Sequence, residues 1–367
     1  MSLAAGRITA AREVIYRRYD PAAFVGRGWL LGEVERFQKD LGRRQLVIVG
    51  EPGSGKSAFI AYLAEHWNCP RHFIRVDSVG GVTGVSARAF LISIGAQLFQ
   101  KYGPDIFARP EPAPTRVSVG VARGRAHLVG RFIEELHSLP FLPRPEGEVD
   151  VRAIAAMGDS EVVGEHVGRL IDVAEALDER TLLHVTLVEP LRLLRDLDPD
   201  EQVVVAVDAL DEALYHPAPR IQDVLPRVSD AGYPQNLKLV MTSRAGDHLA
   251  IFPPADRLDL DDAAKGYREE SQKDARRYIE HRLGEPPLAE AIAARPVDEV
   301  RDFVRRIDDG GAGNFLYLYH LFNETADSIR DGMVDLSAVP IPRDLDDVYR
   351  VFAVEKIKAG TALRDWV

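Results

Sequence analysis

The sequence predicts an α/β fold, in which helices cover both faces of a mainly parallel sheet in three layers. Three stretches support this prediction. Residues 47–63, "VIVGEPGSGKSAFIAYL", are typical of an apolar strand, a glycine-rich loop and a helix. Residues 203–207, "VVVAV", form the continuous apolar run expected of a parallel strand that is buried on both faces. Residues 238–242, "KLVMT", supply a further short strand.

Composition limits the class of protein. The chain has 367 residues, 46% hydrophobic and 28% charged, which is typical of a soluble globular protein of two or three domains. The net charge of −11 does not favour a nucleic-acid-binding surface. The chain contains no apolar run that could span a membrane and no signal-peptide core. A single cysteine, Cys69, excludes an internal disulfide and fits a reducing cytoplasm.

The N-terminal part is predicted to alternate between helices and strands. Residues 1–22 are interpreted as a helical arm, and residues 72–78 as a second strand. Ser86 and Gly103 are suitable cap and stop residues for the helix between them. Another helix is predicted before the glycine-rich loop, because apolar residues recur there at helical spacing, at Leu30, Val34, Phe37 and Leu41.

An insertion at about residues 104–178 interrupts this alternation. Proline-rich loops flank two similar segments, which begin at Val117 and Val151, 34 positions apart. Each segment is typical of a strand, a glycine turn and a strand, which predicts a pair of β-hairpins. Two copies are too few for a solenoid. The insertion is either a sensing or docking element or a tolerated surface insertion.

The C-terminal part is predicted to be mainly helical. Residues 179–197 are expected to form a helix that is interrupted or bent near Pro190, and helices dominate from about residue 260. The predicted organisation is a helical arm (1–22), a nucleotide-binding domain (23–250, with the insertion at 104–178), a helical domain (251–335) and the start of a further domain of winged-helix type (336–367).

The glycine-rich loop predicts a nucleotide. Residues 50–57 match the phosphate-binding loop G-x-x-x-x-G-K-[ST]. Glycines let backbone N–H groups converge on phosphates, and the following helix adds its partial positive charge. Lys56 is expected to reach the β- and γ-phosphates, and the Ser57 hydroxyl to coordinate Mg²⁺, the one metal expected. The predicted nucleotide contacts are Gly50, Glu51, Pro52, Gly53, Ser54, Gly55, Lys56, Ser57 and Ala58.

Acidic residues follow the buried strand. Asp208 stands where an aspartate would hold Mg²⁺ near Ser57. Asp211 and Glu212 are placed to orient or deprotonate an attacking water. Alternatively, the cluster is a solvated helix start. Arg244 ends the next strand, where it can contact a γ-phosphate or be an ordinary surface arginine.

These motifs, in this order, resemble the STAND class of P-loop NTPases and its NACHT branch. "GEPGSGKS", "VVVAVDALDE" and "LKLVMTSR" carry the likeness, and the small residue in "DALDE" is characteristic of that branch. "FVGRGWLLGEV" resembles the motif whose backbone lies against adenine, and "GNFLYL" resembles a turn of the first helical domain. The likeness covers roughly residues 23–355 and includes bacterial NACHT-like ATPases that often precede WD-type repeats. It implies adenine contacts by Phe24, Val25, Gly26 and Arg27.

The resemblance also implies a function. Members of this class are ATP/ADP-dependent switches of the AAA+/STAND type, with slow Mg²⁺-dependent hydrolysis. ADP holds a closed monomer, and the ATP form assembles into a homo-oligomer that brings effector domains together. Sensor and effector domains would then lie outside this chain, in a protein of bacterial defence or signal transduction. Neither a membrane nor a nucleic acid is an expected partner.

Three features depart from the family pattern. Gly28 stands where the adenine motif usually has Glu, and Asn314 and Phe315 replace the usual proline turn. Lys56 and Asp208 are 152 residues apart, which the insertion accounts for. Two alternatives remain: an AAA+-type ATPase that remodels DNA or protein, and a nucleotide-binding scaffold without hydrolysis.

Overall fold

The computed structural model describes residues 19–74, 86–107, 115–123, 127–138, 149–157, 161–172, 178–215, 220–225, 233–311, 313–332, 336–348 and 350. The chain divides into two compact units. The first unit comprises Ile15–Ile74, Ala206–Leu214 and Lys238–Val367, and it carries the glycine-rich loop. The second comprises Met1–Val14, Arg75–Val205 and Tyr215–Leu237, and it carries the repeated segments. The predicted arm lies almost wholly outside the described residues.

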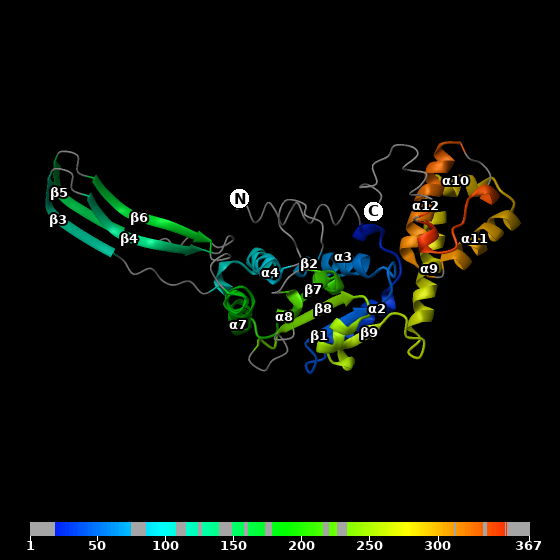
Figure 1. The fold of residues 1–367 in the computed structure, drawn as a ribbon, viewed down its shortest axis with the longest axis horizontal. Coiled ribbons are helices and arrows are strands. Elements are labelled where there is room, and N and C mark those ends of the chain that lie inside the picture. Colours follow the sequence, from blue (N-terminus) through cyan, green and yellow to red (C-terminus); the bar gives the residue numbers. More distant parts are fainter. Residues whose placement is uncertain are drawn as a thin grey trace. The chain divides into compact units, whose positions relative to one another are not determined.

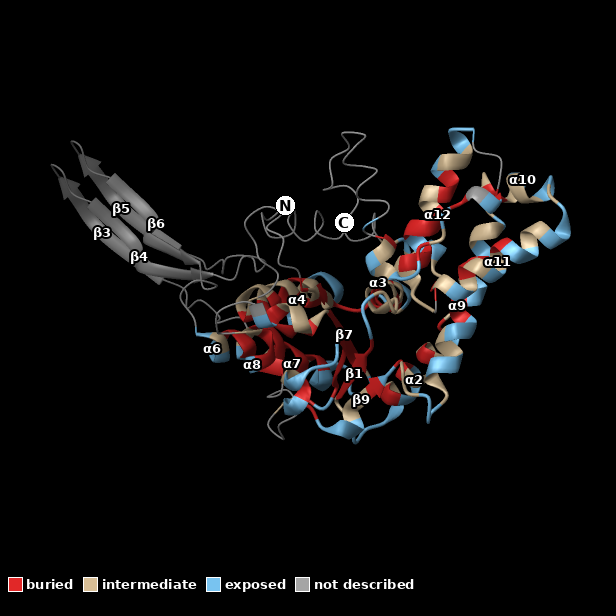
Figure 2. Ribbon diagram, turned by 45° about the vertical axis from the view of Figure 1, so that its right-hand side comes forward, coloured by how far each residue is buried: buried red, intermediate tan, exposed pale blue. Residues whose placement is uncertain are grey.

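A five-stranded sheet organises the fold, and its strands lie in the order β2-β7-β8-β1-β9 (Figure 1). The pairings of β1 with β8, β1 with β9 and β2 with β7 are all parallel. Every residue of β1, β7 and β8 is buried, so the continuous apolar runs lie where the α/β prediction requires. Figure 2 shows β1 and β7 in red. The α/β class is therefore confirmed. The strands are β1 (Gln45–Val49), β2 (Arg71–Phe73), β7 (Val203–Asp208), β8 (Leu237–Ser243) and β9 (Arg257–Asp259).

The helices of the first unit are α2 (Gly28–Lys39), α3 (Lys56–His66), α9 (Tyr267–Leu283), α10 (Leu288–Ala293), α11 (Val297–Gly311) and α12 (Phe315–Arg330). A helical start at residues 345–348 follows them. Phe303, Tyr317 and Phe322 are central to the apolar core that joins α9 to α12. The prediction that Leu41 belongs to the apolar face of α2 is wrong. α2 ends at Lys39, where the Asp40 N–H bonds the carbonyls of Arg36 and Phe37, and Leu41 is 83% exposed.

Among the described residues of the second unit, the helices are α4 (Ala87–Tyr102), α6 (Glu179–Leu183), α7 (Glu189–Leu197) and α8 (Ile221–Val224). Ser86 caps α4 by accepting the Ala89 N–H, and Gly103 ends it at φ 79°, as predicted. The expected bend near Pro190 is a π-helical turn at His184–Val188, because proline has no N–H to close the regular ladder.

The remaining short helices are 3₁₀ turns, at Pro21–Ala23, Pro104–Ile106, Leu210–Tyr215, Asp247–Ile251, Pro254–Asp256 and Leu336–Ala338. Within the described part of the chain, no helix combines the length and the apolar character needed to cross a bilayer.

The described residues of the insertion form four strands, β3 (Thr115–Arg123), β4 (His127–Ser138), β5 (Val149–Met157) and β6 (Glu161–Asp172). The hairpin prediction is wrong in its pairing. β3 pairs with β5, and β4 pairs with β6, and both pairs are parallel. A hairpin would instead pair β3 with β4 in an antiparallel ladder. The two repeats therefore stack, and each strand lies beside its counterpart in the other repeat.

Candidate functional site

The glycine-rich loop has the strand–loop–helix context that its motif requires. β1 enters at Gly50, and α3 begins at Lys56, so Ser57 and Ala58 lie in its first turn. Gly53 and Gly55 adopt φ of 80° and 83°, a left-handed conformation that residues with a Cβ rarely take. The loop can therefore turn tightly in front of a helix N-terminus, which is favourable for an anion.

Lys56 folds back onto this loop. Its Nζ donates to the carbonyl oxygens of Gly50 (2.6 Å) and Glu51 (2.9 Å) and to Ser54 Oγ (3.2 Å). Burial lowers the pKa of Lys56, and the negative charges of Asp208 and Asp211 oppose that shift. The ammonium is thus a largely desolvated cation close to the carboxylates that follow β7, and phosphate oxygens could replace its carbonyl partners.

Thr242 holds the Asp208 carboxylate, a contact that sequence reasoning missed. Its hydroxyl donates to Asp208 Oδ1 (2.5 Å) and accepts the Ala209 N–H (3.0 Å). Ala209 has a φ of 61°, so the chain turns sharply after β7. Asp208 and Thr242 are both buried, and β7 and β8 are neighbours in the sheet. Asp208 is therefore oriented before any ligand arrives.

Two of the three predicted catalytic groups, Asp211 and Arg244, are paired with each other. Arg244 Nε lies 3.2 Å from Asp211 Oδ2, and the Arg244 backbone N–H donates to Oδ1 (3.0 Å). Glu212 lies in the same 3₁₀ turn, with its N–H on the Ala209 carbonyl (3.0 Å). The turn after β7 and the end of β8 thus form one polar cluster.

His248 joins this cluster, and no sequence motif indicates it. Its Nε2 lies 2.7 Å from Ser243 Oγ, and Ser243 is fully buried. Burial lowers the pKa of His248, which favours the neutral imidazole. A neutral imidazole nitrogen can either donate a hydrogen bond to the Ser243 hydroxyl or accept one from it, depending on the tautomer. Ser243 lies next to Arg244.

Arg27 connects the segment before α2 to the loop. Its guanidinium donates to the Ser54 carbonyl (2.5 Å) and to Ser271 Oγ of α9 (2.8 Å), and it lies over the ring of Phe315 (5.2 Å). Burial lowers the pKa of Arg27 to about 10. Phe24, in the same segment, stacks on Tyr62 of α3 at 4.6 Å between ring centroids.

Asp274 of α9 holds this segment and is a further residue that the sequence did not indicate. It is fully buried, and its Oδ2 accepts from Trp29 Nε1 (2.8 Å). A Cβ at Gly26, where φ is 85°, would lie 2.8 Å from Asp274 Oδ1, so glycine is required there. Val25 lies between Phe24 and Gly26 and is half-buried.

The N-terminus of α12 contacts the glycine-rich loop. The Phe315 N–H donates to the Gly53 carbonyl (2.8 Å), and Asn314 Nδ2 donates to the Pro52 carbonyl (2.9 Å). The start of α12 therefore touches the loop directly.

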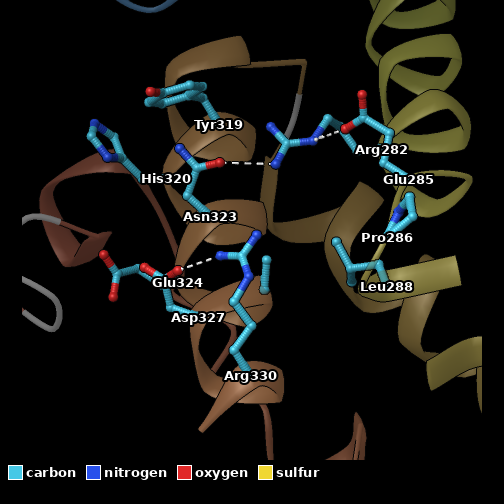
Figure 3. Close-up of a pocket in the computed structure, with 11 residues that line it drawn as sticks. Arg282, Glu285, Pro286, Leu288, Tyr319, His320, Asn323, Glu324, Asp327 and Arg330 are labelled. Atoms are coloured by element: carbon cyan, nitrogen blue, oxygen red, sulfur yellow. Dashed lines mark hydrogen bonds and ion pairs between the residues drawn. The ribbon is translucent and has the colours of Figure 1, made fainter. Parts of the chain in front are cut away.

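The described residues of this unit line at least two cavities. One of about 260 Å³ adjoins the loop and is smaller than typical sites for drug-sized ligands. It is lined by Arg27, Glu51, Ser54, Leu260, Asp261, Arg268, Ser271, Gln272 and Gly313. The other, of about 390 Å³, lies among α9, α10 and α12 (Figure 3). Its arginines are paired inside it, Arg282 with Asn323 and Arg330 with Asp327, and we assign it no ligand.

Comparison with known proteins found no family model that matches the chain and no similar sequence among curated proteins.

Proposed function

We propose that the chain is a P-loop NTPase that binds ATP and ADP with Mg²⁺. One observation carries this proposal: the segments that follow β1, β8 and β7 meet at one edge of a parallel sheet, with β8 between the other two. Ligands of open α/β sheets bind at the carboxyl ends of the strands. The Gly50 N–H, at the end of β1, bonds the Ser243 carbonyl at the end of β8 (3.3 Å). The Arg244 N–H after β8 bonds Asp211 of the turn after β7 (3.0 Å), so the three segments are in contact.

The residues have complementary roles in this proposal. The N–H groups of residues 50–57 and the Lys56 ammonium bind the β- and γ-phosphates. The Ser57 hydroxyl and the Asp208 carboxylate are oxygen donors of the kind that Mg²⁺ prefers, and Thr242 orients the carboxylate. When bound, Mg²⁺ neutralises charge that develops on the phosphates.

Hydrolysis requires a positioned water. Glu212 and Asp211 follow Asp208 in one turn, so we assign Glu212 as the base that takes the proton and Asp211 as a group that orients the water. Arg244 would release its bond to Asp211 and contact the γ-phosphate.

The contacts around the loop support a switch. Arg27 and the N-terminus of α12 bond the carbonyls of Pro52, Gly53 and Ser54. A nucleotide that reshapes this loop therefore changes the free energy of packing α12 against it, and ATP and ADP can favour different arrangements. We infer the central ATPase module of a STAND/NACHT-type signalling protein, which forms a homo-oligomer when activated and whose sensor and effector domains lie outside this chain.

The first experiment is to denature the purified chain, identify any nucleotide it releases, and measure ATP affinity and turnover. Retained ADP with slow turnover supports the switch. An empty site with fast turnover that DNA or an unfolded protein stimulates would favour a remodelling ATPase.

Three variants test the assignment. Lys56→Ala should abolish nucleotide binding, whereas Lys39→Ala, an exposed lysine in α2, should bind normally. Glu212→Gln should bind ATP and lose hydrolysis. Normal affinity in Lys56→Ala would contradict the phosphate-loop assignment, and unchanged turnover in Glu212→Gln would remove its role as base.

A further inference from the structure

The strands of the insertion pair by sequence equivalence. Every paired position in β3 and β5, and in β4 and β6, is 34 residues from its partner, which is the spacing of the two repeats. Similar residues therefore lie side by side, such as Val117 with Val151 and Leu136 with Leu170. Repeat 1 (β3 and β4) and repeat 2 (β5 and β6) form a stack of two equivalent layers.

A stack of only two layers has too few neighbouring layers to be stable by itself. β3–β5 and β4–β6 are two-stranded sheets, so each strand has one paired neighbour among the described residues. Isolated two-stranded sheets are marginally stable, and stacked repeats need about three or more layers because each layer is stabilised by its neighbours. The unpaired edges are backbone templates for another strand.

Charge complementarity identifies the strand that fits these edges. The paired positions carry opposite charges: Arg116 with Asp150, Arg131 with Glu165, and Glu135 with Arg169. Repeat 1 thus carries Arg then Glu where repeat 2 carries Glu then Arg. A repeat paired in parallel and in register with its own copy would place like charges together, which is destabilising. The charges on the edge of repeat 1 are therefore complementary to those of repeat 2 and not to those of another repeat 1.

We propose that the strands β3 to β6 are a self-assembly surface, on which repeat 2 of one chain pairs in parallel with repeat 1 of a second copy. The same 34-residue offset and the same opposite charges recur across this contact. It is a head-to-tail contact, so it extends to further copies and forms a ring or a filament. The inference rests on the strand pairing and not on the nucleotide site, and it goes beyond the proposed function because it adds a contact surface that the proposed function does not name.

The test is a charge swap in both repeats of the full chain, Arg131→Glu, Glu135→Arg, Glu165→Arg and Arg169→Glu together. The swapped chain keeps opposite charges within itself and towards another swapped chain. Against a wild-type chain, like charges meet at both positions in either direction of stacking. Differently tagged wild-type and swapped chains are mixed, with and without ATP, and their co-purification and sedimentation are measured.

We expect each chain to assemble with itself, and mixed assembly to be weaker by about tenfold or more, because two attractive pairs become repulsive. The matched control swaps Asp298 and Arg301, an exposed pair in α11, and should mix freely with wild type. A wild-type chain that stays monomeric at every concentration and nucleotide condition would overturn the proposal, as would unselective mixing.

Hydrogen exchange on the wild-type chain gives a second readout that needs no variant to fold. The amides of β3 to β6 should become protected as the protein concentration rises. Protection that is independent of concentration would show that another part of the same chain covers the edges, and it would also overturn the proposal.

Discussion

The side-chain amide of Asn314 bonds the phosphate-loop candidate and its own helix at once. Its Nδ2 donates to the carbonyl of Pro52 (2.9 Å), while its Oδ1 accepts the N–H of Tyr317 (3.0 Å) as the N-cap of α12. A Cβ at Gly53 would lie 2.1 Å from that Oδ1, so the loop and the cap approach too closely for any side chain there. One residue therefore couples a helix terminus to the loop.

Replacing Asn314 by Asp separates these two roles. Aspartate still accepts the Tyr317 N–H, so we expect the free energy of unfolding to change little. It cannot donate to Pro52, and it places a negative charge beside the loop, so ATP affinity should fall by about tenfold, the value of one lost hydrogen bond. Titration calorimetry with ATP and thermal unfolding measure the two effects.

Asn314→Ala is the matched control because it removes both roles. It should destabilise the fold by about 1 kcal/mol through the lost cap. Wild-type ATP affinity in Asn314→Asp would show that the bond to Pro52 does not influence the loop.

Thr242→Val tests the support of the proposed magnesium ligand. Valine has nearly the same shape, but it leaves Asp208 Oδ1 and the Ala209 N–H without the threonine hydroxyl. We expect a loss of about 1–3 kcal/mol in unfolding free energy. The dependence of ATP binding on Mg²⁺ should also weaken, because the carboxylate loses its orientation.

Thr242→Ser keeps the hydroxyl and should retain the Mg²⁺ dependence. The comparison uses urea unfolding together with ATP titrations at several Mg²⁺ concentrations. Equal Mg²⁺ dependence in the valine and serine variants would argue against a role of Asp208 at the metal.

Local chemistry made part of this structure predictable from the sequence. Glycine spacing indicates the loop, continuous apolar runs indicate the buried strands, and Ser86 and Gly103 mark the ends of α4. The contacts of Thr242 and Asp274 were not predictable, because Asp208 and Trp29 lie far from them in the sequence and only the fold brings them together.

The contacts of buried Lys238 and the pairing of the repeats were likewise not predictable from the sequence. Lys238 interrupts an apolar strand pattern, yet its ammonium bonds carbonyls at the end of α2, including that of Asp40. In the insertion, the sequence pattern predicts strands, but a hairpin and a stack share the same alternation and differ only in which strands pair.

Arg244→Ala tests whether the partner of Asp211 acts in hydrolysis. The variant loses the guanidinium but keeps the backbone N–H that bonds Asp211, so the turn after β7 should remain in place. We expect turnover to fall by about tenfold or more with ATP affinity little changed, since the guanidinium would act on charge that develops in the transition state. Arg36→Ala, an exposed arginine of α2, is the control. Unchanged turnover would show that Arg244 is an ordinary surface arginine without a role in hydrolysis.

The hydroxyl of Tyr317 gives a pH-dependent prediction for the helical core. It donates to the Pro342 carbonyl (2.6 Å), and burial raises the pKa of Tyr317 to about 12. Between pH 10 and 12 the folded chain keeps this proton while the unfolded chain loses it, so the free energy of unfolding falls as pH rises through this window. Tyr317→Phe lacks the titration. It should be about 1 kcal/mol less stable than wild type at pH 8, and the difference should shrink above pH 10. Urea unfolding at both pH values measures it, with half-exposed Tyr319→Phe as the control. A difference that stays constant with pH would show that the Tyr317 hydroxyl titrates alike in both states.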